Sequence, residues 1–245
     1  MARQKLGQHF LIKGSVLERI AAAVCPSREE LVIEIGPGRG ALTQKLLARA
    51  QRVVAIELDP QLTAHLRGKY DSRVEVVEGD VLETDLSQWG RAPVAGNLPY
   101  YIASAIVARV IRLPIPRAVF LIQKEVAERI VAVPGSRDYG FLSVEVAVFA
   151  RARLLFEVKP TAFHPPPKVD SAVVVLEPRG EQAVEDAEGF LRFVGLCFHH
   201  KRKTIRNNLA ERYGNAVDSW PEAGLRAEQI SLGQFVEMYR RVEVA

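Results

Sequence analysis

Short apolar runs alternate with segments of helical periodicity over the first half of the chain. The run ELVIEIG at 30–36, rich in branched aliphatic residues and ended by glycine, is typical of a buried strand. In other segments apolar residues recur at helical spacing, as Ile102, Ile106 and Val110 do. The pattern predicts strands at 30–36, 52–58, 73–79, 93–96 and 118–123, and helices at 41–50, 61–70, 101–112 and 125–132. This alternation predicts a mostly parallel, doubly wound α/β sheet.

The pattern changes after the fifth expected strand. Two apolar runs, LLFEV at 154–158 and SAVVVLE at 171–177, are joined by a segment too short for a crossover helix. We therefore expect them to pair antiparallel at one edge of the sheet. From about residue 184 the spacing is helical only, and the stretch EPRGEQAVED, with Pro, Gly and acidic residues, precedes it. This predicts a Rossmann-like α/β domain at 1–180 and a small all-helical domain at 181–245.

The composition is that of an ordinary globular protein of 245 residues. Cys25 and Cys197 lie far apart, so we expect reduced thiols. No Cys, Asp or Glu stands at ligand spacing from the histidines, so no metal site is predicted. The longest apolar stretches are broken by Arg or Glu, and the N-terminal FLI is too short for a signal peptide. We therefore expect a cytoplasmic protein that does not span a membrane.

The positive charge is concentrated in two places, although the net charge is only +4. Arg3, Lys5 and Lys13 open the chain with no acid among them. The segment HHKRKTIRNNLAER at 199–212 holds five Lys or Arg residues against one Glu. Two such clusters suggest a surface that binds a polyanion. The alternative is a solvated helix face.

Three glycines stand between the first expected strand and the first expected helix. Gly36, Gly38 and Gly40 in EIGPGRG allow a tight turn and the close approach of a ligand. Glu57 follows Gly36 by 21 residues and ends the second expected strand, where a carboxylate can accept hydrogen bonds from both hydroxyls of a ribose. The order of a strand, a glycine loop, a helix and then an acidic residue predicts a cofactor that contains adenosine. The alternative is a plain turn and a surface Glu.

The glycine spacing helps to choose between cofactors. The loop reads G-x-G-x-G, without the third-glycine spacing of the dinucleotide motif. Asp80, after the third expected strand, can accept a hydrogen bond from an adenine amine, although it can also cap a helix. These features favour S-adenosyl-L-methionine over NAD.

The stretch NLPY follows the fourth expected strand and would face the cofactor. An adenine N6 is a poor nucleophile because its lone pair is conjugated into the ring. Two acceptors for its hydrogens, the Asn97 side-chain oxygen and the Leu98 carbonyl, would return electron density to nitrogen and orient it. Pro99 restricts Leu98 to an extended shape, and Tyr100 offers a face on which an extruded base can stack. The alternative is an Asn cap with a proline that ends a strand.

Several longer motifs follow one another along the chain. They are RQKLGQHFL, EIGPGRGALT, AIELD, EGDVLE, GNLPYYIAS, QKEVAERIVAVPGSRDYGFLSV, FHPPPKVDSAVV and FHHKRKTIRNNL. With these motifs in this order, the chain resembles the KsgA-type ribosomal RNA adenine dimethyltransferases over nearly its whole length. Members of that family dimethylate N6 of two adjacent adenines near the 3′ end of 16S ribosomal RNA in the small ribosomal subunit. The resemblance implies a class I methyltransferase fold, S-adenosyl-L-methionine as cofactor and 16S ribosomal RNA as partner, and we expect a monomer.

The resemblance also implies roles for individual residues. Cofactor contacts are implied at His9, Leu11, Gly36, Gly38, Glu57, Asp80 and Asn97. Asn97, Leu98, Pro99 and Tyr100 would hold the target amine, and Phe163 would close the other side of the base or pack in the core. A basic helix with Lys201, Arg202, Lys203 and Arg206 would contact RNA phosphates or pack across the domain junction. His9 and Tyr101 depart from the family pattern, which often has Asn and a smaller or polar residue there.

Four alternatives stay open from the sequence. A related enzyme that modifies large-subunit RNA shares most motifs, but QKEVAERIVAVPGSRDYGFLSV resembles the small-subunit enzymes more. A DNA adenine methylase would require a large target-recognition domain, and residues 181–245 are few for that. A non-catalytic nucleic-acid-binding relative could tolerate decay of the motifs, which are intact here. A dehydrogenase would require a catalytic His or Tyr-Lys pair, and none is apparent.

Overall fold

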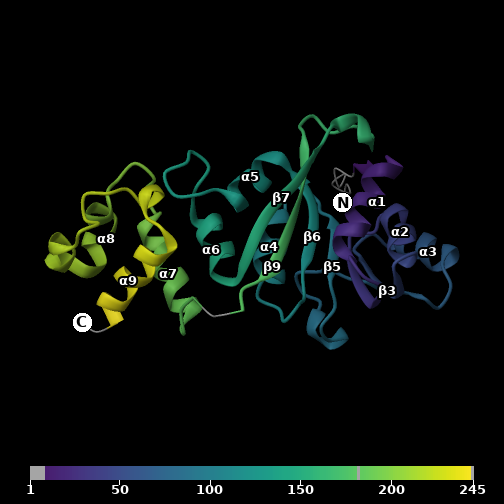
Figure 1. The fold of residues 1–245 in the computed structure, drawn as a ribbon, viewed down its shortest axis with the longest axis horizontal. Coiled ribbons are helices and arrows are strands. Elements are labelled where there is room, and N and C mark those ends of the chain that lie inside the picture. The colour runs from purple at the N-terminus through teal and green to yellow at the C-terminus, as the bar shows by residue number, and fades with distance from the viewer. Residues whose placement is uncertain (1–8, 181–182, 244–245) are drawn as a thin grey trace, which may run out of the picture. The chain divides into compact units, whose positions relative to one another are not determined.

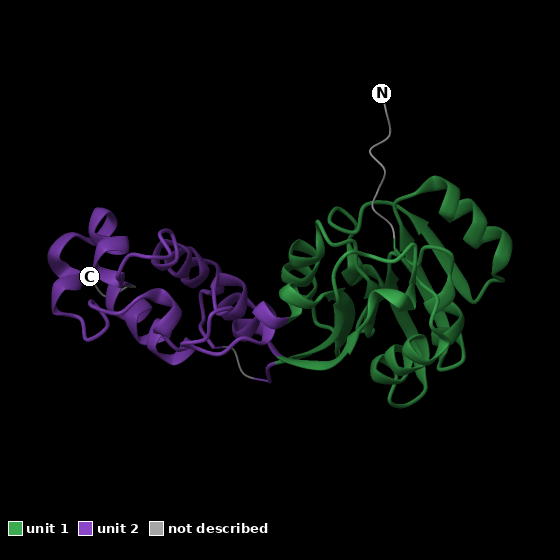
Figure 2. Ribbon diagram, turned by 90° about the horizontal axis from the view of Figure 1, so that it is seen from above, with its two compact units in different colours: residues 1–127, 152–178 green, residues 128–151, 179–245 purple. Residues whose placement is uncertain are grey.

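We describe residues 9–180 and 183–243 of a computed structural model (Figure 1). The chain divides into two compact units (Figure 2). Unit 1 comprises residues 1–127 and 152–178, and unit 2 comprises residues 128–151 and 179–245. The N-terminal basic residues Arg3 and Lys5 lie outside the described residues. No helix within the described ranges is both long and apolar enough to cross a membrane.

Unit 1 is built on a seven-stranded sheet in the order β4-β3-β2-β5-β6-β9-β7. The strands are β2 (Glu29–Ile35), β3 (Ala50–Glu57), β4 (Val74–Glu78), β5 (Val94–Asn97), β6 (Ala118–Gln123), β7 (Ala150–Val158) and β9 (Ser171–Pro178). The first five in spatial order run parallel, and β9 runs antiparallel to β6. The α/β fold and all five strands expected in the first half of the chain are therefore confirmed.

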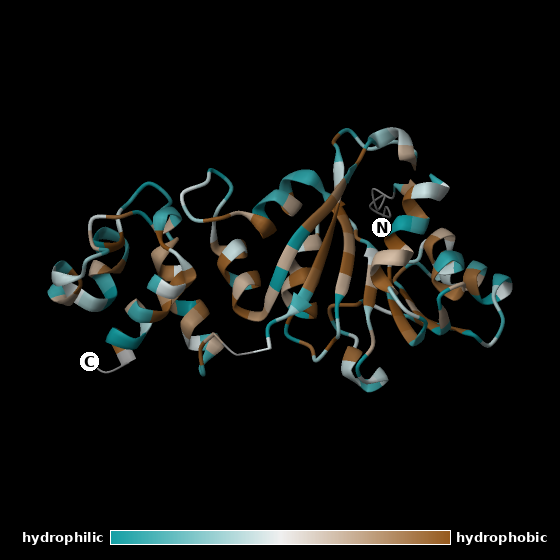
Figure 3. Cartoon of the chain, in the orientation of Figure 1, coloured by the Kyte–Doolittle hydropathy of each residue, from teal (hydrophilic) through white to brown (hydrophobic). Residues whose placement is uncertain are grey.

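The four helices expected between and after the parallel strands are present. They are α2 (Ala41–Leu47), α3 (Pro60–Lys69), α4 (Ala103–Val110) and α5 (Lys124–Val131), and a 3-10 helix, η1 (Leu86–Trp89), precedes β5. Local chemistry fixes the start of α3: the Asp59 side chain accepts a hydrogen bond from Gln61 N, and Pro60 occupies the first turn. The central strands are mostly hydrophobic (Figure 3), because both faces of the sheet are covered.

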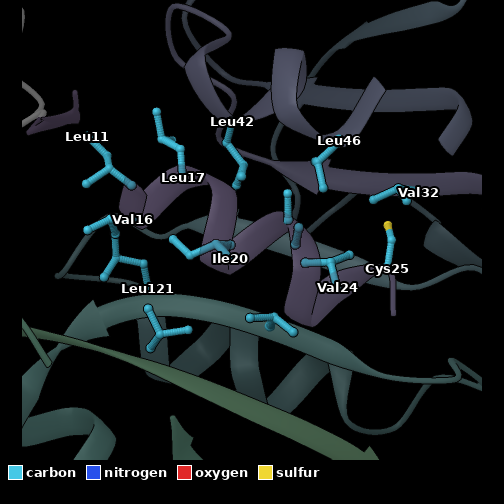
Figure 4. Packing of buried hydrophobic residues seen from close by; sticks show 14 of the residues in the cluster. Leu11, Val16, Leu17, Ile20, Val24, Cys25, Val32, Leu42, Leu46 and Leu121 are labelled. Carbon is cyan, nitrogen blue, oxygen red and sulfur yellow. The ribbon is translucent and has the colours of Figure 1, made fainter. Parts of the chain in front are cut away.

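A further helix, which the sequence pattern did not predict, packs on one face of this sheet. Helix α1 (Gly14–Val24) buries the stripe Val16, Leu17, Ile20, Ala21 and Val24. Figure 4 shows α1 between Leu42 and Leu46 of α2 and Leu121 of β6. Just before α1, the short strand β1 (Phe10–Leu11) pairs antiparallel with β8 (Phe163–His164), which follows the 3-10 helix η2 (Pro160–Ala162). This pairing ties the N-terminal segment to a loop over 150 residues away.

Unit 2 is helical and has its own core. It contains α6 (Phe141–Phe149), α7 (Ala187–Cys197), α8 (Ile205–Tyr213) and α9 (Leu232–Glu243), with the 3-10 helices η3 (Gly214–Ser219) and η4 (Ala227–Gln229). Phe190, Phe193 and Phe235 are fully buried in this core. The Tyr139 hydroxyl donates to the Ile230 carbonyl at 2.9 Å, which links 128–151 to the C-terminal segment.

The division into units differs from the predicted domains at one segment. The predicted boundary after residue 180 is two residues from the division at Pro178. The segment 128–151, however, groups with the C-terminal helices, because Val144 and Val148 of α6 join the core formed by α7 and α9. The chain therefore enters unit 2 early, returns to unit 1 through β7, and leaves again after β9.

Candidate active site

A cavity of about 220 Å³ opens where the parallel strands of unit 1 end. Four of its walls follow the carboxyl ends of strands: the glycine loop after β2, Glu57 and Leu58 after β3, residues 79–81 after β4, and residues 97–102 after β5. The N-terminal segment 9–12 supplies a further wall. Parallel α/β sheets bind their ligands at this edge. Most of the residues that the sequence assigned to a site are brought together here.

The glycine loop adopts a backbone that only glycine accepts readily. Gly36, Gly38 and Gly40 have φ values of 66°, 58° and 78°. A Cβ on Gly38 would lie 3.0 Å from the Phe10 ring, and one on Gly40 would lie 2.6 Å from the Tyr70 hydroxyl oxygen. Side chains at these three positions would therefore be strained, and Gly36 and Gly38 line the cavity together with Pro37 and Arg39.

Glu57 is buried at the cavity wall and holds the glycine loop. Its carboxylate accepts hydrogen bonds from Gly38 N and Asp59 N, both at 3.0 Å. Burial raises its pKa, and these backbone hydrogen bonds oppose the rise. A carboxylate has about four acceptor positions, so two hydrogen bonds leave capacity for ligand hydroxyls. Leu58, the next residue, also lines the cavity.

Asp80 caps a turn, which is one of the two roles that the sequence left open, and it also lines the cavity. One carboxylate oxygen accepts a hydrogen bond from Leu82 N at 2.8 Å and so caps the turn after β4. The same residue lines the cavity. The cap fixes the side chain, and its remaining acceptor positions are available to a ligand amine.

Glu34 is a cavity residue that the sequence analysis did not select. It is 1% exposed and accepts a hydrogen bond from the Thr43 hydroxyl at 2.6 Å. Burial raises its pKa to about 7, although the Thr43 hydrogen bond opposes the rise. Its position in the sequence could have indicated the site, because a carboxylate is unusual inside an apolar strand and Glu34 stands two residues before Gly36.

The raised pKa of Glu34 predicts a pH-dependent stability. Between its ordinary pKa of 4.5 and about 7, the unfolded chain releases the Glu34 proton while the folded chain keeps it. The free energy of unfolding therefore decreases with rising pH over this window. Glu34→Gln removes the titration, so we expect the difference in Tm, variant minus wild type, to become more positive from pH 5 to pH 8. Thermal unfolding across this range measures it, and a difference independent of pH would contradict the assignment.

The Asn97 side-chain nitrogen and the Leu98 backbone nitrogen both donate hydrogen bonds within the protein. The Asn97 Nδ2 donates to the His9 carbonyl at 3.0 Å, and the Leu98 N–H donates to the Leu121 carbonyl at 3.0 Å. Within the described part of the chain, neither the Asn97 Oδ1 nor the Leu98 carbonyl oxygen has a hydrogen-bond partner. Both residues line the cavity, so it carries two acceptors close together in the chain.

Tyr100 is held through both its hydroxyl and its ring. Its hydroxyl forms a 2.9 Å hydrogen bond with Ser171 Oγ, and its ring stacks on His9 with a centroid distance of 5.8 Å. Burial raises the pKa of Tyr100, against the effect of the Ser171 hydrogen bond. His9 Nδ1 in turn donates to the Pro165 carbonyl at 2.8 Å. These contacts orient the Tyr100 ring at the cavity wall.

The other predicted residues around the cavity divide into two groups. His9, Leu11 and Pro99 line the cavity. Phe163 does not: it is 3% exposed and belongs to the hydrophobic cluster that includes Leu11 of β1. In this structure Phe163 therefore packs in the core, and its contact with a target base stays a prediction. His164, which follows it, lines the cavity instead.

The basic residues of unit 2 form a turn, which corrects the prediction of a basic helix. Lys201, Arg202 and Lys203 are exposed and precede α8, which begins at Ile205 after the Thr204 cap. The Asn208 side chain holds this turn: its Oδ1 accepts from His200 N at 3.0 Å, and its Nδ2 donates to the Cys197 carbonyl at 2.8 Å.

Arg206 differs from the three basic residues of the turn. It lies in α8 and pairs with Asp218 at 2.8 Å, so its charge is partly neutralised. The exposed positive charge of this region is therefore concentrated in the turn.

The sheet order, the glycine loop and the cavity at the strand ends define a class I S-adenosylmethionine-dependent methyltransferase. Residues 1–243 match the family model described as ribosomal RNA adenine dimethylase. The chain belongs to this family.

Relatives in several bacteria agree with the family match. The chain is 42% identical to the ribosomal RNA small subunit methyltransferase A of Acidobacterium capsulatum, over 98% of this chain and 91% of the relative. It is 40% identical to the protein of the same name from Bordetella bronchiseptica, over 96% and 92% of the two chains.

Two solved structures share the fold over nearly the whole chain. A dimethyladenosine transferase from Plasmodium falciparum superposes with a TM-score of 0.83 at 24% identity, covering 96% of this chain and 98% of the other. The 23S rRNA methyltransferase ErmE superposes with a TM-score of 0.74 at 29% identity, covering 96% and 99%. The fold of the family is thus present in both units of the chain.

Proposed function

We propose that the protein dimethylates N6 of two adjacent adenines near the 3′ end of 16S ribosomal RNA in the small ribosomal subunit. The observation that carries the proposal is the pair of acceptors at Asn97 and Leu98 in the wall of the cavity. The names of the relatives, which are small-subunit RNA methyltransferases at up to 42% identity, support the substrate.

The residues present fit S-adenosylmethionine. Gly36 and Gly38 line the cavity without side chains, which allows a ligand to approach their backbone closely, and Glu57 has acceptor positions left for ribose hydroxyls. Gly36, Gly38, Glu57 and Asp80 would hold the cofactor, with His9 and Leu11 on the N-terminal side. When bound, the cofactor supplies a methyl group activated by its sulfonium.

The chain's own contribution at the target is positioning. The Asn97 Oδ1 and the Leu98 carbonyl accept the two hydrogens of the adenine amino group. This returns electron density to N6 and fixes its direction. Because the Asn97 Nδ2 already donates a hydrogen bond to the His9 carbonyl, the Asn97 Oδ1 is oriented before the base arrives. Pro99 restricts the backbone of Leu98 and so limits the direction of the Leu98 carbonyl. Tyr100, held by Ser171, provides a fixed ring for stacking.

Glu57→Ala should weaken cofactor binding first. The substitution removes the acceptors for two ribose hydroxyls and releases Gly38 N. Hydrogen bonds to a charged group are worth about 1.5–3 kcal/mol each, so we expect the Kd for S-adenosylmethionine to rise at least about tenfold. Calorimetric titration measures this. Glu30→Ala, at an exposed carboxylate outside the cavity, is the matched control, and an unchanged Kd in Glu57→Ala would place the ribose elsewhere.

Unit 2 would supply part of the RNA-binding surface. Reversing the charges of the basic turn, with Lys201→Glu, Arg202→Glu and Lys203→Glu together, should lower the affinity for small subunits and flatten its salt dependence. Each lost phosphate contact reduces the slope of log K against log salt by about 0.7–0.9. Filter binding at several salt concentrations measures the slope.

A matched control changes the net charge equally at another place. Arg28, Arg52 and Arg73 lie at the amino ends of β2, β3 and β4, opposite the cavity edge of the sheet. Reversing these three should leave the salt slope nearly unchanged. If the two triple variants behaved alike, the basic turn would be a solvated surface without a specific role.

We further propose that the substrate is RNA folded within the small subunit, since the basic turn alone is short for recognition of an isolated hairpin. The protein would act as a monomer in the cytoplasm. Transfer of labelled methyl to unmodified small subunits tests the proposal, with large subunits and duplex DNA beside them. Label on small subunits alone supports it. Label on large subunits would instead favour the activity named for ErmE, and label on DNA would refute an RNA substrate.

A further inference from the structure

Tyr101 is an exposed aromatic residue at the cavity that the chemistry above does not use. It is 65% exposed and lines the cavity. No hydrogen bond or ring contact joins its side chain to the described residues. Single exposed apolar side chains are common, but one that lines a ligand cavity is informative.

The position of Tyr101 in the chain places it on the target side of the cavity. It follows Tyr100 directly, in the turn between β5 and α4. Consecutive Cα atoms are about 3.8 Å apart, so the backbone of Tyr101 adjoins that of Tyr100, whose ring is proposed to stack on the target base. Tyr100 is fixed by Ser171 and His9, and Tyr101 is the exposed aromatic neighbour. Leu58 is another exposed apolar residue of the cavity, at 48%, but it follows Glu57 on the cofactor side.

We propose that Tyr101 stacks on the nucleobase adjacent to the target adenine. The inference rests on the proposed function. A base held at Asn97 is joined to its neighbour by a single phosphodiester, so the neighbour stays at the mouth of the cavity, where Tyr101 is exposed. Aromatic side chains stack on any base, because every base has a π-face. Tyr101 would therefore accept the adjacent adenine both before and after that adenine is methylated.

Replacing the ring should weaken RNA binding without affecting the cofactor. We expect Tyr101→Leu, which keeps apolar area but loses the flat ring, to raise the KM for unmodified small subunits about tenfold. This corresponds to about 1.4 kcal/mol, within the range for base–aromatic stacking. The Kd for S-adenosylmethionine should not change. Tyr101→Phe restores the ring and should recover most of the lost affinity. Val169→Ala, at an exposed apolar residue outside the cavity lining, is the control with an unchanged KM.

A double-mutant cycle identifies the stacked base. Small subunits are reconstituted with RNA that has an abasic nucleotide in place of one of the two adjacent adenines. The abasic change should raise the KM of the wild type about tenfold and that of Tyr101→Leu far less, because the contact is already lost. Equal effects on both proteins, or an unchanged KM in Tyr101→Leu, would overturn the proposal. Wild-type transfer to unmodified subunits is measured first, so a failure of the proposed function is recognised separately.

Discussion

Asn97→Ala is expected to lower kcat for RNA methylation by about 10²–10³, the usual loss when one oriented hydrogen-bonding group is removed from a reaction centre. The substitution removes the Oδ1 that would accept an adenine amino hydrogen, while the Leu98 carbonyl remains. The Kd for S-adenosylmethionine should change much less, because Glu57 and the glycine loop are untouched. Single-turnover methyl transfer to unmodified small subunits measures the chemical step apart from binding.

The effect on the N-terminal segment must be separated from the effect on chemistry. Asn97→Ala also loses the 3.0 Å hydrogen bond from Nδ2 to the His9 carbonyl. Calorimetric titration with the cofactor monitors that loss, since His9 and Leu11 line the same cavity. Asn215→Ala, at an exposed position in unit 2, is the matched control for the substitution itself. Full activity of Asn97→Ala would refute the acceptor role.

Gly96→Ala is expected to destabilise unit 1 strongly. A Cβ at Gly96, in the buried strand β5, would lie 2.7 Å from the Ile35 carbonyl oxygen and 2.7 Å from Leu98 Cδ2. The Ile35 carbonyl belongs to the backbone of the neighbouring strand β2, so it cannot move away by a change of rotamer. Overpacking of this kind costs about 1–3 kcal/mol, and we expect about 2 kcal/mol. The corresponding fall in Tm is about 4–8 °C for a protein of this size.

Thermal unfolding with a second glycine variant isolates the steric cause. Gly68 lies on the exposed surface of α3, and a Cβ there would meet nothing within 4 Å. Gly68→Ala should leave Tm unchanged or raise it slightly, because alanine favours helix. If Gly96→Ala were as stable as Gly68→Ala, β2 and β5 would have to separate easily, against the buried packing of both strands.

The sequence was sufficient for the parts of the fold that local patterns determine. Each of the five parallel strands is a short apolar run with a glycine or polar stop, and each is found within about two residues of its predicted bounds. The glycine loop, Glu57, Asp80 and Asn97 were predictable for the same reason: they follow strands directly, and parallel strands end at one edge of a sheet. Their convergence on one cavity follows from the topology.

Contacts between distant segments were not predictable in this way. The hydrogen bond from Tyr100 to Ser171 and the pairing of β1 with β8 join residues 71 or more positions apart, and no spacing in the sequence encodes them. The segment 128–151 was placed with the sheet because α5 continues the alternation of strand and helix, whereas Val144 and Val148 pack into unit 2. The basic run at 201–203 was assigned to a helix, but Thr204 caps α8 only after it.

The identity of the methylated nucleoside tests the central claim most directly. Unmodified small subunits are treated with labelled S-adenosylmethionine and either the wild type or Asn97→Ala, and the RNA is digested to nucleosides for mass spectrometry. We predict N6,N6-dimethyladenosine with the wild type and almost none with Asn97→Ala. Label on a ring nitrogen, on another nucleoside or on no nucleoside would contradict the claim that Asn97 and Leu98 present an adenine amine.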